Sequence, residues 1–141
     1  MTNVTADTTS SLLHRFKNAV AANDLRDVFL GFEQTPVAER DGEIVVIIAV
    51  KEQSGADSFS QNGRRFLPVK SVFTVTALAK PDVPYEKLLD FFENTVLERL
   101  LAAAPFARFQ TKPLEHDRKL NRLRLTSEFT LGACLEVTDN V

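Results

Sequence analysis

The last third of the chain alternates between apolar and polar residues, and this pattern constrains the fold more than any other feature. From Leu123 to Val137 the odd positions read Leu, Leu, Ser, Phe, Leu, Ala, Leu, Val, while the even positions are mostly polar. A period of two sustained over this length predicts one long amphipathic antiparallel strand, with a bulge expected at Gly132. Its expected partner is Phe106–Leu114, joined to it by a polar turn over Glu115–Asn121.

A second pair of strands is expected earlier in the chain. The longest apolar run, Ile44–Val50, lies within Glu43–Glu52 and is typical of a buried strand at the centre of a sheet. Phe66–Ala79 then returns as a long strand, which predicts a hairpin. Between them Gln53–Gly63 is polar and contains glycine, so we expect a flexible hairpin loop near residues 53–65.

Two helices are predicted from apolar spacing and capping residues. Ser10 or Ser11 caps a first helix that ends near Asn23. Asp82 caps a second helix that ends at Ala104, because Pro105 follows. The second helix has a core stripe and a wider apolar arc, which fits either deep burial or a subunit contact. The stripe consists of Tyr85, Leu88, Leu89, Phe92, Val96 and Leu100, and the arc adds Phe91, Leu97, Leu101 and Ala104.

These elements, with a short strand over Asp27–Glu33, predict an α+β fold. We expect a twisted, mostly antiparallel sheet packed by two main helices in the order α-β-β-β-α-β-β. A chain of 141 residues with 44% hydrophobic and 26% charged residues is typical of one globular domain, here residues 10–141 after a disordered tail over 1–9. No apolar run approaches the roughly 20 residues of a membrane helix, so no membrane partner is expected.

The residues that usually carry catalysis or bind metals are few and scattered. His14 and His116 have no metal-ligand partner at helical or strand spacing, and a solvated turn explains His116 better than a metal site. Cys134 is the only cysteine and has no histidine nearby in sequence. Gly63–Arg65 lacks the ending of a phosphate-binding loop. We therefore expect no enzyme activity, no catalytic residue, no cofactor and no metal.

Charge is unevenly distributed along the chain although the net charge is only −2. Residues 1–63 carry five basic and nine acidic side chains, whereas residues 108–124 carry six basic and two acidic ones. Such a distribution can bring an acidic face of one copy to a basic face of the next, and repeated head-to-tail contacts close into a ring. A solvated strand edge whose charges discourage aggregation explains the pattern equally well.

The order of elements resembles a known family. It begins with a capped helix and a strand hairpin that has a long polar loop. It continues with a helix opened by Pro81-Asp-Val-Pro-Tyr-Glu-Lys-Leu-Leu89 and a final strand Arg122-Leu-Arg-Leu-Thr-Ser-Glu-Phe-Thr-Leu131. This order is similar to that of the tail terminator proteins of long-tailed bacteriophages, the lambda U type, including versions in Mu-like prophages. The resemblance covers residues 10–137 and is one of order and length.

The resemblance implies a structural role and specific partners. Such proteins form a homohexameric ring that caps the tail tube, stops its polymerisation and presents the surface that joins the head. The implied partners are further copies of the chain, the tail tube protein and a head-completion protein, with at most DNA passing through the channel. The implied location is the cytoplasm of the bacterial host and, for a functional phage, the virion tail.

Candidate contact residues follow from charge and exposure. In the loop they are Phe59, Arg64 and Arg65, expected to make contacts in the assembled tail. In the last hairpin they are Arg118, Lys119, Arg122 and Arg124, expected at the ring contact or along the channel. Two alternatives remain: a small α+β binding module that recognises a protein or nucleic acid through the basic hairpin, and an enzyme whose pocket gathers His14, His116 or Cys134 with carboxylates.

Overall fold

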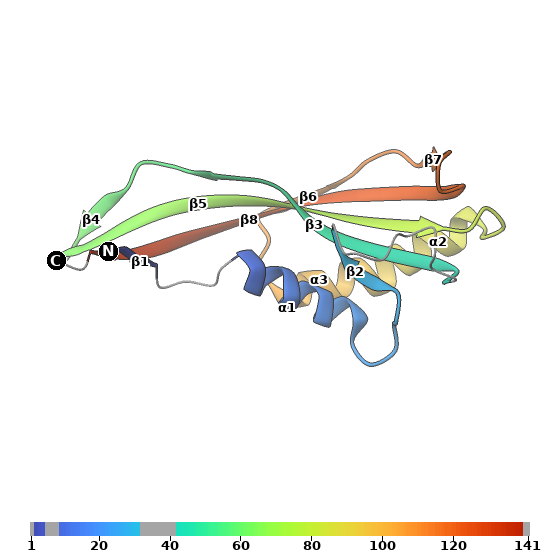
Figure 1. The fold of residues 1–141 in the computed structure, drawn as a ribbon, viewed down its shortest axis with the longest axis horizontal. Helices are drawn as coiled ribbons and strands as arrows, with labels where there is room; N and C mark the ends of the chain where they lie inside the picture. Colours follow the sequence, from blue (N-terminus) through green and yellow to red (C-terminus); the bar gives the residue numbers. More distant parts are fainter. Residues whose placement is uncertain (1, 5–8, 32–41, 140–141) are drawn as a thin grey trace.

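The computed structural model describes residues 2–4, 9–31 and 42–139, which form one long sheet with helices against one face (Figure 1). The helices are α1 (Thr9–Ala21) and a continuous helical segment made of α2 (Tyr85–Phe91), η2 (Phe92–Leu97) and α3 (Glu98–Ala103). The strands are β1 (Thr2–Val4), β2 (Val28–Leu30), β3 (Ile44–Gly55), β4 (Phe59–Gln61), β5 (Arg64–Ala79), β6 (Arg108–Thr111), β7 (Glu115–Asp117) and β8 (Arg122–Asp139). The predicted α+β class is confirmed.

The sheet is organised around its two longest strands. The strand order is β1-β8-β5-β3-β2, with β4 paired to β5 and both β6 and β7 paired to β8. The antiparallel ladder between β5 and β8 runs from Arg65↔Val137 to Ala79↔Leu123. The predicted hairpin of β3 and β5 and the pairing of the last strand with the segment before it are both present. The short strand β2 runs parallel to β3, so the sheet is mixed at that edge.

The bulge lies in a different strand from the one expected. The β5–β8 ladder passes through Lys70↔Gly132 without a shift of register. In β3, by contrast, Val50 pairs with Phe73 and Glu52 pairs with Val72, which leaves Lys51 as the extra residue. Gly132 is therefore an ordinary strand residue, and its missing side chain is not a sign of a bulge. Lys51 follows Val50 and therefore lies on the opposite side of the sheet from it. Glu52 pairs with Val72, the neighbour of Phe73, and lies on that opposite side too. The bulge therefore places Lys51 and Glu52 on the same side of the sheet.

The long helix begins later than expected and contains a wider turn. Its first residue is Tyr85, and Pro84 precedes it without a side-chain cap, so Asp82 is not the capping residue. Leu88, Phe92, Val96 and Leu100 are all 0–2% exposed and recur every four residues. In a regular α-helix such a stripe drifts by about 40° per step. The π-helical segment η2 has more residues per turn and opposes this drift, which keeps all four side chains against the sheet.

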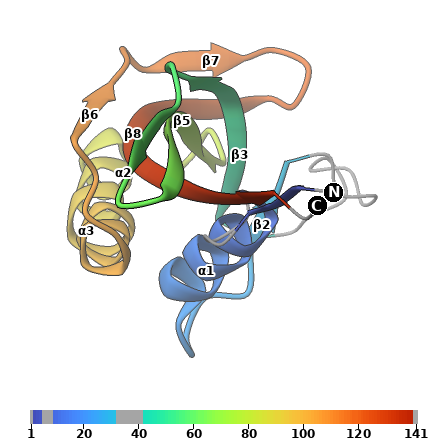
Figure 2. The same cartoon turned by 90° about the vertical axis from the view of Figure 1, so that its left-hand side faces the viewer.

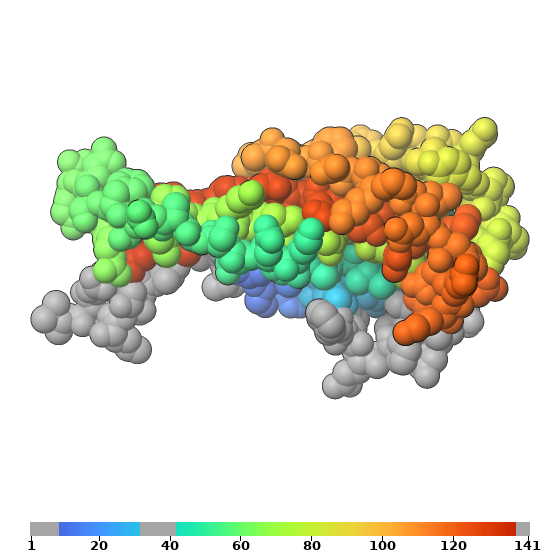
Figure 3. Space-filling view, turned by 90° about the horizontal axis from the view of Figure 1, so that it is seen from above, coloured from blue at the N-terminus to red at the C-terminus, as the bar shows by residue number. Residues whose placement is uncertain are grey.

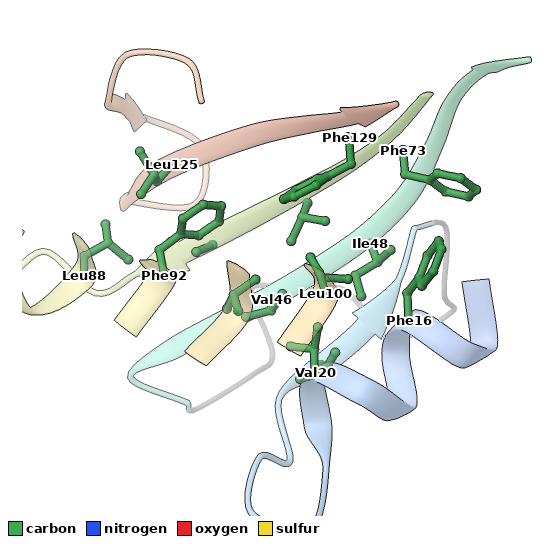
Figure 4. Packing of buried hydrophobic residues seen from close by; sticks show 14 of the residues in the cluster. Phe16, Val20, Val46, Ile48, Phe73, Leu88, Phe92, Leu100, Leu125 and Phe129 are labelled. Carbon is green, nitrogen blue, oxygen red and sulfur yellow. The ribbon is translucent and has the colours of Figure 1, made fainter. Parts of the chain in front are cut away.

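The core lies between the helices and one face of the body of the sheet (Figures 2 and 4). Phe16 of α1 meets Phe73 of β5 edge to face at 5.0 Å, and both rings are almost fully buried. Phe106 joins them, with its ring 5.2 Å from Phe16 and 5.3 Å from Phe129. Two expected members of the helix face lie outside this core, because Tyr85 is 47% exposed and Leu101 is 45% exposed.

The expected tail and the expected loop both contribute strands, and these strands lie at the same end of the sheet (Figure 1). Thr2–Val4 pair with Val137–Asp139, whereas a tail was expected over residues 1–9, and residues 1 and 5–8 lie outside the described part. Most of residues 53–65 belong to β3, β4 and β5, with only Ala56–Ser58 and the Asn62–Gly63 turn between strands. Whether this stretch is flexible stays a prediction. Within the described ranges, no helix combines the length and the apolar character needed to cross a membrane.

Candidate functional site

The residues that could support catalysis are separated in the fold. His14 is exposed on α1, His116 is exposed on β7 with its Nε2 3.1 Å from Oδ1 of Asn121, and Cys134 is exposed on β8. Among the residues that the structure describes, no three His, Cys, Asp or Glu side chains are grouped so that they could hold a metal ion. The three residues that an enzyme would need to gather therefore lie on three different elements.

One cavity of about 280 Å³ lies where β2 and β3 begin, and three of the charged side chains that line it form ion pairs. It is lined by Asp24, Asp27, Glu43, Ile44, Lys87 and Phe91 among others. Nζ of Lys87 lies 2.9 Å from both carboxylate oxygens of Glu43. The guanidinium of Arg99 donates hydrogen bonds to Asp24, which lowers the pKa of that carboxyl. Acids stabilised in their charged form are poorly suited to accept or deliver protons near neutral pH.

The most distinctive feature is a strand extension that projects beyond the helices, here called the arm (Figures 1 and 3). The arm comprises 51–55 of β3, β4, 64–70 of β5 and 132–137 of β8. No member of the hydrophobic core cluster lies in these ranges, and residues 51–65 are exposed throughout. The base of the arm is tied to the first helix, because Nε2 of Gln53 donates to Oγ1 of Thr9 at 3.2 Å and lies 3.4 Å from Oγ of Ser71.

The tip of the arm contains three of the sequence-predicted contact residues. Asn62 and Gly63 have φ of 53° and 77°, as the two central residues of a type I′ hairpin turn require. Phe59 is 45% exposed and stacks on Phe66 with ring centroids 5.5 Å apart. Arg64 and Arg65 are exposed beside it, with Nε of Arg64 3.6 Å from Oε1 of Glu136. The structure therefore brings Phe59, Arg64 and Arg65 together on one projecting tip.

The four basic residues of the last hairpin have different surroundings. Arg118 and Lys119 are exposed in the turn between β7 and β8, whereas Arg124 forms ion pairs with Glu115 and with Asp117, the latter at 3.5 Å. Arg122 is only 5% exposed, and its guanidinium donates to the carbonyl oxygens of Gly42 at 3.0 Å and Leu78 at 3.3 Å. Arg122 therefore serves the fold of this chain, and its side chain is not available for an outside contact.

The sheet face opposite the helices carries a charged cluster that the sequence did not reveal. Nζ of Lys51 lies 2.7 Å from Oε1 of Glu128, and Nζ of Lys112 lies 2.9 Å from the same oxygen. These bonds lower the pKa of Glu128, with the hydrogen bond from Lys51 the largest cause, and the same bond raises the pKa of Lys51. The cluster links β3 and the segment after β6 to β8, and it uses cations that would otherwise be free to bind phosphate.

Comparison with known proteins gives a similarity of fold but no match of sequence. No family model matches the chain, and no curated protein matches its sequence. Among solved structures, the chain is similar to the sheath/tube terminator of an extracellular contractile injection system, PVC, determined by cryo-electron microscopy in the extended state. The TM-score is 0.47 with 15% sequence identity, and the match covers 95% of this chain and 58% of that one. This chain thus spans less than two thirds of the length of that terminator.

Proposed function

We propose that this protein is a structural component of a phage or prophage tail that caps the tail tube as an oligomeric ring, stops polymerisation and presents the head-joining surface. The observation that carries the proposal is the arm, whose exposed aromatic and basic tip lies away from the core of its own chain. An exposed ring flanked by arginines has the composition that protein interfaces favour. The order of elements along the chain, which resembles the tail terminator family, supports the same role.

The proposal assigns different roles to the predicted contact residues. Phe59, Arg64 and Arg65 at the tip form contacts between proteins in the assembled tail. Arg118 and Lys119 in the β7–β8 turn and Arg124 on β8 are assigned to the ring contact or to the channel lining. The ring is proposed to be a hexamer, with the tail tube protein and a head-completion protein as its neighbours, in the host cytoplasm during assembly and then in the virion.

The alternative function, a small module that binds nucleic acid through its basic last hairpin, has less support than the tail role. Of its six basic side chains, Lys112 and Arg124 are neutralised by Glu128, Glu115 and Asp117, and Arg122 is buried. Nucleic-acid affinity depends on cations that can replace counterions at phosphates, and paired or buried cations cannot do this well. The structure leaves too few exposed cations in one place for the hairpin to be a strong nucleic-acid site.

The test is tail length in the strain that carries the gene. Deleting the gene should give tails of variable, excessive length that do not join heads, as seen by negative-stain electron microscopy. Complementation with the wild-type gene should restore uniform tails, and a gene that encodes Phe59→Ser, Arg64→Ser and Arg65→Ser should not. Tails of normal length that join heads in the deletion strain would refute the proposed function.

A further inference from the structure

The exposed side of the long helix carries acids that no described residue of the chain neutralises. Glu86, Asp90 and Glu93, here called the acidic row, are exposed and form no ion pair with any residue in the described ranges. The two basic residues of the same helix are engaged elsewhere, Lys87 with Glu43 and Arg99 with Asp24. The helix therefore presents a net negative surface, with Tyr85 exposed beside it.

The acidic row is unfavourable for the isolated chain. Residues three or four apart are neighbours on a helix surface, so Asp90 lies close to both Glu86 and Glu93. Like charges at these spacings destabilise a helix by a few tenths of a kcal/mol per pair, and no cation of the described chain relieves them here. A basic partner that covers the row would convert this repulsion into attraction, and an aromatic group on that partner could pack against Tyr85.

The same chain carries a surface with the complementary composition. The tip of the arm presents Phe59 with Arg64 and Arg65, and the arginine guanidinium is well suited to bind carboxylates. The tip and α2 lie at opposite ends of the molecule, so the tip of one copy cannot reach its own acidic row (Figure 1). Only a second copy can bring the two surfaces together.

We infer that the arm tip of one copy docks on the acidic row of the next copy. This inference rests on the proposed ring and names the surfaces that join its subunits. Because the tip and the row are different patches, each copy uses one patch on either neighbour, and such heterologous contacts close into a ring when the rotation allows it. Arg118, Lys119 and Arg124 are then left to the channel or to the partners of the ring.

Charge reversal tests this pairing directly. One variant carries Asp90→Lys and Glu93→Lys, which reverse two of the three acids of the row and leave Glu86 to favour the helix N-terminus. The other carries Arg64→Glu and Arg65→Glu. Self-association is measured by sedimentation velocity and light scattering over a concentration series. Circular dichroism checks that each variant is folded, and the neutral pair Asp90→Asn and Glu93→Gln replaces the first variant if it does not fold.

We expect each charge-reversal variant alone to associate about tenfold more weakly than the wild type or worse, since it brings like charges together at the contact. Mixing the two variants in equal amounts should restore association, because every contact in an alternating ring then joins opposite charges. A third variant, Arg118→Glu with Lys119→Glu, tests the other candidate ring contact by reversing two exposed cations of the β7–β8 turn. Association should stay unchanged in this variant, because the inference leaves these residues to the channel or to the partners of the ring.

Three outcomes would overturn the inference. The first is a wild type that associates while neither reversal weakens it, which would leave the ring in place but locate its contact elsewhere. The second is loss of association only in the Arg118 and Lys119 variant, which would assign the contact to the β7–β8 turn. The third is a wild type that stays monomeric at every concentration. The tail-length experiment decides the proposed function independently of all three.

Discussion

The body and the arm are built on the same two strands but differ in what covers them. In the body, β5 and β8 contribute Phe73, Val75, Leu125 and Phe129 to a core closed by α1 and the long helix, and all four are 0–2% exposed. In the arm, the same strands continue past Lys70 and Gly132 without contributing to that core. The comparison indicates that the free energy of folding comes mainly from the body, while the arm is available for contacts with other molecules.

The sharpest test replaces one phenylalanine in each region. Phe129→Ala removes a ring that is 0% exposed and packs against Phe106 and Phe109, so we expect unfolding to become easier by about 3–5 kcal/mol. Phe59→Ala removes a ring that is 45% exposed, and we expect less than about 1 kcal/mol. Urea denaturation followed by circular dichroism measures both. Similar losses would show that the arm shares in the stability of the body.

A second test compares a buried arginine with a surface one. Arg122→Met removes the donor to the carbonyl oxygens of Gly42 and Leu78, and we expect a loss of about 1–3 kcal/mol because these groups lose their hydrogen bonds. Arg124→Met breaks exposed ion pairs to Glu115 and Asp117 and should cost about 0–1 kcal/mol. Equal effects in urea denaturation would contradict a structural role for Arg122.

A third test adds one methyl group to each region. A Cβ at Gly31 would lie 2.8 Å from Cβ of Ala49, so Gly31→Ala should destabilise the body by about 1–3 kcal/mol. A Cβ at Gly132 would meet nothing within 4 Å, so Gly132→Ala should stabilise the protein by about 0.4–1 kcal/mol, because it restricts the unfolded chain. Melting temperatures of the two variants should move in opposite directions. A fall in both would show that Gly132 is packed more tightly than described.

The smallest effect is expected from the charged cluster on the open face of the sheet, and it depends on pH. The pKa of Glu128 is lowered from 4.5 in the folded state, so its contribution to stability is present above that value and is lost as the pH falls through the folded pKa. Glu128→Gln should therefore be less stable than wild type at pH 7, and the difference should disappear well below pH 4.5. Urea midpoints at several pH values measure this. A difference that persists in strong acid would point to packing rather than charge.

Much of the body could be predicted from local pattern. The alternation through Leu125 and Phe129 located the longest strand and its buried face, and the apolar run at Ile48 located its neighbour in the sheet. Local pattern could not show that β8 pairs mainly with β5, since that contact joins residues far apart in sequence. The position of the bulge at Lys51 depends on the pairing of β3 with β5 and not on composition.

The candidate site was only partly accessible from sequence. Phe59, Arg64 and Arg65 were chosen as an exposed loop, and the Asn62-Gly63 dipeptide, a strong hairpin signal, could have identified the strands on either side of it. Burial of Arg122 had no local signal, because its partners Gly42 and Leu78 come from other parts of the chain. The acidic row was not among the residues chosen from sequence, because only the structure shows that no described residue neutralises it.

The strand pairing of the arm also affects the entropy of any contact made at its tip. The β4–β5 turn is held by Phe59↔Phe66 and its neighbours, and β5 is held in turn by β8 as far as Arg65↔Val137. Residues already fixed in a ladder lose less backbone freedom on docking than residues of a free loop. More of the interaction energy of Phe59, Arg64 and Arg65 is then expressed as affinity. The expected kinetic result is slow dissociation, with residence time sensitive to substitutions that weaken the ladder far from the contact itself.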